Sequence, residues 1–135
     1  MSGYCYRNDT QLNLGRVKVN EVVEEIAVAE KYLTEMLEAD RTSDYEAFIR
    51  RFDKIDLEGF DKDIFLNDTE QMQEDLGTYK SRFYLGSLKG FKEDKYPRCL
   101  RFVWRAIYEK NEALIVVGIH KKDAVWYVNE STVSK

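Results

Sequence analysis

Apolar and polar positions alternate along this chain at two different periods, first at helical spacing and later at strand spacing. Between residues 19 and 37, apolar side chains return every three or four positions, while glutamates and a lysine occupy the opposite side. That spacing places the apolar side chains on one face of a helix. The pattern therefore predicts a long amphipathic helix over residues 19–37.

A second helix is predicted after a break at residues 40–42. Ser43 and Glu46 have the Ser-x-x-Glu spacing of a capping box, in which both side chains bind free backbone amides at a helix start. Phe48 and Phe52 then recur at helical spacing on one face. We expect this short helix to pack its aromatic face inward.

A third, shorter helix is predicted to begin near Asn67 or Asp68, either of which is a candidate capping residue. Met72 and Leu76 would face inward from it. Gly77 stands where a helix is expected to end in a left-handed cap.

After this glycine the apolar positions alternate with a period of two, which predicts strands. The four predicted strands cover residues 79–88, 99–108, 113–120 and 124–133. Gly86 favours a bulge that lets the sheet curl. Short polar connections require an antiparallel meander, and the upstream helices must cover one of its faces. The predicted fold class is α+β, with three N-terminal helices packed on a curved antiparallel four-stranded sheet.

Three segments of the chain carry a family resemblance, namely residues 39–48, 76–86 and 124–128. Together they resemble the nuclear transport factor 2-like superfamily, whose cystatin-like α+β cone is shared with ketosteroid isomerases and polyketide cyclases. The chain looks closest to small bacterial members of that superfamily. The resemblance covers roughly residues 19–131, and it implies a cone-shaped pocket between the first helix and the sheet.

Aromatic side chains on the helices and on one strand face form the candidate ligand site. They are Tyr32, Tyr45, Phe48, Phe102, Trp104 and Tyr108. Large rings with polar tips would line such a pocket well. The same rings would also fill a closed core, so both interpretations stand.

The strand predicted over residues 113–120 is apolar on both faces, and no further helix is available to cover its outer side. We therefore expect a homodimer formed through the outer face of the sheet. The first functional hypothesis is a non-catalytic binding or assembly domain that holds a small apolar ligand.

The alternative hypothesis is a small enzyme of the isomerase or cyclase type. In the resembling superfamily, such enzymes move a proton with a carboxylate placed in an apolar cavity. The inward strand face offers no carboxylate, which leaves Asp44, Glu46 or Glu130 as candidates, and no catalytic residue is assigned. A third possibility is an adaptor that binds another protein through residues 1–16. These residues show no sustained period, so we expect them to form a loosely ordered arm. A single domain is expected over residues 17–135.

Charge and hydropathy argue against two classes of partner. The net charge is −4, and acidic and basic residues alternate, so there is no basic stripe for nucleic acid. No apolar run is long enough to cross a membrane, and the opening residues lack the apolar run of a signal peptide. We expect a cytoplasmic protein.

No metal or cofactor motif is recognisable. Cys5 and Cys99 lack the paired spacing of metal sites, and the acidic stretch at residues 56–63 lacks the glycine and glutamate of a calcium loop. His120 is expected at a solvated hairpin shoulder. Arg101 and Arg105 are expected on the strand surface, where they would pair with acids or lay their stems over apolar neighbours.

Overall fold

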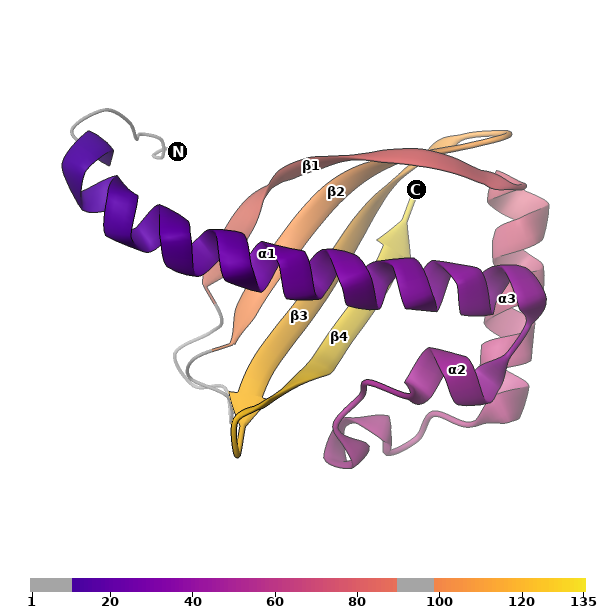
Figure 1. Cartoon of the computed structure of the whole chain (residues 1–135). Coiled ribbons are helices and arrows are strands. Elements are labelled where there is room, and N and C mark those ends of the chain that lie inside the picture. Colours follow the sequence, from indigo (N-terminus) through magenta and orange to yellow (C-terminus); the bar gives the residue numbers. More distant parts are fainter. Residues whose placement is uncertain (1–10, 90–98) are drawn as a thin grey trace.

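The computed structural model describes the backbone of residues 11–89 and 99–135, and it has the predicted α+β architecture (Figure 1). The helical elements are α1 (Gln11–Thr42), α2 (Tyr45–Ile49), the short 3₁₀ helix η1 (Lys54–Leu57) and α3 (Lys62–Leu76). The strands are β1 (Tyr79–Lys89), β2 (Leu100–Tyr108), β3 (Glu112–Lys122) and β4 (Val125–Ser134). Figure 1 shows α1 lying across one face of the sheet, with α2 and α3 near the C-terminal end of α1.

The long helix α1 buries the apolar stripe that the sequence predicts. Ala29, Leu33 and Met36 face the sheet and are almost completely buried. The helix begins at Gln11, so residues 11–16, expected to belong to an irregular arm, are helical; residues 1–10 lie outside the described residues. It ends at Thr42.

The capping box predicted for α2 is wrong, because the capping residue is Asp44. Its carboxylate accepts a hydrogen bond from the backbone N–H of Ala47 at 3.1 Å. Ser43 instead has a φ of +56°, whereas an N-cap residue takes extended backbone geometry. A left-handed residue at this position turns the chain sharply between α1 and α2.

Helix α3 begins earlier than predicted, because Asp61 rather than Asn67 or Asp68 caps it. The Asp61 carboxylate accepts from the Ile64 N–H at 2.9 Å. Gly77 is the C-terminal cap, as predicted, and has a φ of +78°, but its ψ of −153° lies outside the left-handed helical region that the prediction named. A Cβ at this glycine would lie only 2.8 Å from a carboxylate oxygen of Glu109.

All strands pair antiparallel in the order β1-β2-β3-β4, as a meander requires. A register shift between Tyr84 and Gly86 confirms the predicted bulge in β1. Two further shifts were not predicted from the sequence: one lies between Tyr79 and Ser81 of β1, and the other leaves Asn129 of β4 as an extra residue between the partners of Gly118 and Ile119. Bulges increase local twist, and so these shifts curl the sheet around α1.

A buried polar contact holds α1 on the sheet. Trp104 of β2 is fully buried, and its indole N–H donates to Glu30 of α1 at 2.9 Å. Arg82 of β1 donates to the other carboxylate oxygen of Glu30 at 2.7 Å. Because Glu30 binds two strands at once, it fixes where the helix crosses the sheet.

The chain between α2 and η1 is tied to the outer edge of β4. Phe52 forms a parallel bridge with Val128, supported by the Asp53 N–H to Val128 carbonyl bond at 3.2 Å and the Val128 N–H to Arg51 carbonyl bond at 2.8 Å. This bridge holds the helical segment beside β4 and leaves a space between them.

Candidate functional site

Two cavities open between the helices and the sheet, and both are lined by Asp40, Thr69 and Met72. The smaller has a volume of about 210 Å³ and lies among α1, α3, β1 and β2. The larger is a cleft of about 670 Å³ that extends from α3 to the α2–η1 segment and β4. Asp40 therefore lies where the two spaces meet.

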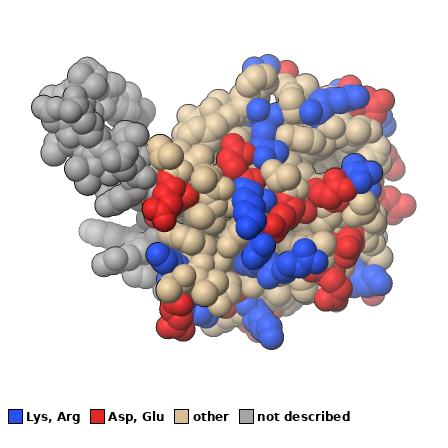
Figure 2. All heavy atoms as spheres, in the orientation of Figure 1, with Lys and Arg blue, Asp and Glu red and all other residues tan. Residues whose placement is uncertain are grey.

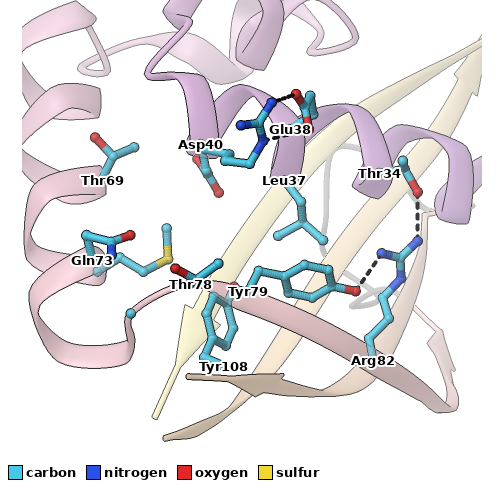
Figure 3. A pocket seen from close by; sticks show the side chains of 13 residues that line it. Thr34, Leu37, Glu38, Asp40, Thr69, Gln73, Thr78, Tyr79, Arg82 and Tyr108 are labelled. Carbon is cyan, nitrogen blue, oxygen red and sulfur yellow. Dashed lines mark hydrogen bonds and ion pairs between the residues drawn. The ribbon is translucent and has the colours of Figure 1, made fainter. Parts of the chain in front are cut away.

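The smaller cavity collects polar side chains from four elements. Figure 3 shows the Asp40 carboxyl pointing from the last turn of α1 toward the space bordered by Thr69 of α3 and Tyr108 of β2. Arg82 lines the far side, where its guanidinium donates to the Tyr79 hydroxyl at 3.0 Å and to Thr34 at 2.8 Å. Arg82 is thereby held away from Asp40.

Among the carboxyl groups of the described residues, Asp40 is the one whose ionisation the fold resists most. Burial, and secondarily the negative charge of Asp68, raises its pKa to about 7. Among the residues that the structure describes, no cation lies within ion-pair distance of Asp40 or Asp68. Near neutral pH this carboxyl is therefore able both to donate and to accept a proton.

Tyr108 contributes a second unusual group to the same cavity. The residue is 6% exposed, and its hydroxyl is buried without a hydrogen-bond partner among the described residues. Burial and the nearby Asp40 charge raise the pKa of this hydroxyl above its usual range. An unsatisfied buried hydroxyl costs about 1–3 kcal/mol, and ligand-binding sites are among the places where such a cost persists.

The larger cleft has an aromatic wall and an acidic rim. Phe48 stands at the centre of the wall, with ring centroids 5.6 Å from Phe52, 6.0 Å from Phe60 and 5.0 Å from Phe65. The carboxylates that line the cleft come from α1, η1, α3 and β4: Asp40, Asp56, Asp68, Asp75 and Glu130. Among the described residues of the lining, Lys135 is the one basic side chain.

The structure distributes the predicted ligand-site aromatics between core and cavities. Phe102 and Trp104 are fully buried and line neither cavity. Tyr32 is also in the core, where its hydroxyl donates to the Trp126 carbonyl at 3.2 Å. Tyr45 packs against Phe60 and lines neither of the two spaces.

Of the six, Phe48 lines the larger cleft and Tyr108 the smaller cavity. The predicted set therefore does not converge on one space.

The three acids that the sequence offered as pocket carboxylates differ from Asp40, the acid whose pKa is strongly raised. Asp44 caps a helix and Glu46 is exposed, while Glu130 accepts from the Arg101 guanidinium at 2.8 Å. Sequence reasoning missed Asp40, although a signal exists: it continues the buried stripe of α1 after Met36. A carboxylate at an apolar stripe position marks a buried acid.

His120 is not at a solvated hairpin shoulder as expected, since it is only 3% exposed. Its Nε2 lies 3.1 Å from Asp53 and its Nδ1 lies 2.8 Å from the Asn129 side-chain amide. Lys122 also donates to Asp53, at 2.9 Å, and these bonds lower the pKa of the Asp53 carboxyl to about 2. The bulge at Asn129 aims its amide at His120.

Donor atoms of Asp53, Asp56 and His120 lie within 4.8 Å of one another, the spacing of a metal site. Lys122 already supplies a positive charge to Asp53 there. We therefore interpret the group as a charge-compensated buried network that joins η1, β3 and β4.

Positive and negative side chains are intermixed on the face seen in Figure 2, without a field of one sign. Across the part of the chain that the structure describes, no helix has the length and apolar character needed to cross a membrane.

Comparison with protein-family models, curated proteins and solved structures gives no match. The fold and cavities define the class as an α+β domain with an internal cleft.

Proposed function

We propose that this chain is a small-molecule-binding domain whose ligand occupies the cleft between α3, the α2–η1 segment and β4, with its polar end at Asp40. The cleft itself carries the proposal: about 670 Å³ of aromatic-lined space shares the partly buried Asp40 carboxyl with a second cavity. Apolar walls with a few convergent polar groups are the usual composition of ligand sites.

Two energetic features support this interpretation over that of an imperfect core. Neither the raised pKa of Asp40 nor the unsatisfied Tyr108 hydroxyl stabilises the folded chain. A ligand that offers a hydrogen bond to either group would recover part of that cost. Perturbed groups gathered at one cavity are typical of functional sites.

Two experiments test the proposal: adding small compounds that would bind in the cleft, and blocking the cleft with a larger side chain. Small apolar compounds with one polar group should shift backbone amide resonances around Met72 and Asp40. Thr69→Phe, which inserts a ring into both cavities, should weaken binding at least tenfold. Ile64→Phe adds the same ring on the exposed part of α3, where it lines neither cavity, and should leave binding unchanged. Shifts scattered over the surface, or equal affinity in both variants, would refute the proposal.

A second candidate function follows from the pairing of Asp40 with Tyr108. An acid with a pKa of about 7 is matched to proton transfer near neutral pH. Tyr108 lines the same cavity, and its buried, unpartnered hydroxyl is a candidate donor to an oxyanion. This favours an isomerase or cyclase type of reaction, in which Asp40 removes a proton next to a carbonyl.

Deuterium exchange into small ketones, followed by NMR, tests that activity. The exchange rate should rise with pH through about 7, fall by orders of magnitude in Asp40→Asn and fall less in Tyr108→Phe. A rate equal to that of buffer alone would exclude this candidate.

The expected homodimer remains part of the proposal. Phe83 and Leu114 flank Arg105 on the outer sheet face and are 54% and 44% exposed. Sedimentation should show a dimer that Phe83→Glu dissociates and that Ile55→Glu, at an exposed site on η1, leaves intact. A clean monomer of the unaltered chain at high concentration would rule the dimer out.

The helices-first order and the curled meander also support the proposed relation to the nuclear transport factor 2-like superfamily.

A further inference from the structure

The large cleft pairs its aromatic wall with an excess of negative charge. Its described lining includes five carboxylates and a single basic side chain. Two of the five are locally compensated, because Lys135 lies 3.0 Å from Asp75 and Arg101 lies 2.8 Å from Glu130. Asp40 and Asp68 have no such partner among the described residues, and both line the cleft; Asp40 also lines the smaller cavity.

These two carboxylates come from different helices, line the same cleft and are close enough to interact electrostatically. Asp40 belongs to the last turn of α1 and Asp68 to the middle of α3, and the charge of Asp68 disfavours the ionised form of Asp40. Like charges held together in this way favour a cation between them. The aromatic cluster around Phe48 lies in the same cleft and offers ring faces as well as apolar area.

The geometry points to an organic ammonium compound as the ligand class: an apolar body against the Phe48 cluster and one positively charged nitrogen between Asp40 and Asp68. This inference rests on the proposed function, since it assigns the ligand of the same cleft. Tyr108 lines the adjoining cavity, and its buried hydroxyl is an independent polar group without a protein partner among the described residues. It is free to accept an ammonium hydrogen bond.

Other ligand charges fit the lining less well. A carboxylate ligand would face the uncompensated Asp40 and Asp68, and the nearby guanidinium of Arg41 is already paired with Glu38. A bare divalent cation would not use the aromatic wall. Within the described residues, the one cluster with metal-ligand spacing is the Asp53, Asp56 and His120 group, which shares Asp56 with the cleft lining but includes neither Asp40 nor Asp68.

Proton release provides a signature specific to this ligand class. A cation beside Asp40 favours its ionised form and lowers its pKa from about 7. At pH 7 about half of the Asp40 carboxyls hold a proton, so binding an ammonium group releases a fraction of a proton. A neutral ligand in the same cleft would not release one.

Three probes with one apolar body test the inference: phenylbutylamine, phenylbutanol and phenylbutyrate. Their affinities are measured by titration calorimetry at pH 7 in buffers of different ionisation enthalpy. We expect the amine to bind most tightly and the carboxylate most weakly. Only the amine should release protons, and its affinity should rise between pH 6 and pH 8.

Variants localise the charge recognition. Asp68→Asn should weaken amine binding about threefold, the size of a partly exposed ion pair. Asp40→Asn should weaken it more and should abolish proton release. Asp63→Asn removes a charge from the exposed first turn of α3, the helix that also carries Asp68. Asp63 does not line the cleft, so this variant should change neither the affinity nor the proton release.

The outcomes separate this inference from the proposed function. Equal affinity for the three probes, or tightest binding of the carboxylate, overturns the ammonium assignment while leaving a ligand cleft. An amine preference that survives in the Asp40→Asn and Asp68→Asn double variant also overturns it. If none of the probes binds and no other small apolar compound shifts the cleft resonances, the proposed function fails as well.

Discussion

Replacing Asp40 by asparagine should stabilise the protein at high pH and leave its stability almost unchanged at low pH. The pKa of this carboxyl is about 7 in the folded chain, against 3.8 for an ordinary aspartate. Each pH unit between those values is worth about 1.4 kcal/mol, so ionising Asp40 costs the folded state up to about 4 kcal/mol. Because the residue is only partly buried, we expect about 2–4 kcal/mol.

The sign follows from proton binding. Between pH 4 and pH 7 the folded chain retains a proton on Asp40 that the unfolded chain has lost, so stability falls as the pH rises through this window. Above pH 7 both states are ionised and the penalty is constant. The amide introduced by Asp40→Asn is neutral throughout, so the gain in stability should grow from pH 4 to pH 7 and then level off.

Urea unfolding at pH 4.5, 6, 7 and 8 measures this difference, with the two chains compared at each pH. The exposed Asp63→Asn variant is the control and should show little pH-dependent change. Asp53 does not interfere, because its pKa is lowered to about 2 and it stays ionised over the whole range. The same stability difference at pH 4.5 and pH 8 would refute the reasoning, since Asp40 would then ionise as an ordinary surface acid.

Three further substitutions probe the contacts that shape the fold. Glu30→Leu should lower the free energy of unfolding by about 2–4 kcal/mol, because the buried Trp104 indole N–H loses its acceptor, and urea denaturation measures the loss. Gly118→Ala should cost about 1–3 kcal/mol in the same assay, since the new Cβ would lie 2.5 Å from the Asn129 side-chain oxygen. Asp53→Asn should destabilise the chain at pH 7 and much less near pH 2, because the stabilising ionised carboxylate is lost as the pH falls from about 4 through about 2.

The first two of these have a control variant, and the third has an outcome that would contradict it. Glu24→Leu removes an exposed acid from the same helix as Glu30 and should cost less than about 0.5 kcal/mol. Asn129→Ser removes the clashing oxygen, so Gly118→Ala should cost less in an Asn129→Ser background than in the unaltered chain. A loss from Asp53→Asn that is as large near pH 2 as at pH 7 would show that the Asp53 contacts do not depend on its charge.

The fold class was predictable from the sequence because it depends on short-range patterns. The stripe that includes Leu33 and Met36, the alternation through Phe102 and Trp104, and Gly86 each report a local preference that the final structure keeps. Errors occurred where local signals competed. Asp44 took the capping role predicted for Ser43, since several polar residues near a helix start are all able to cap it.

The candidate site depended on contacts between segments far apart in the chain. In the sequence, Asp40 is an ordinary polar residue at a helix break, and Tyr108 is one more ring on an inward strand face. Their unusual chemistry arises only when α1, α3 and β2 enclose both in one cavity.

The sequence alone thus determined which elements form and which faces they bury, because hydrophobic periodicity is a local property of the chain. The tertiary structure alone decided which aromatics became core and which line a cleft, and it placed Asp68 near Asp40. Burial and charge proximity set a pKa, and both depend on packing between elements rather than on neighbouring residues.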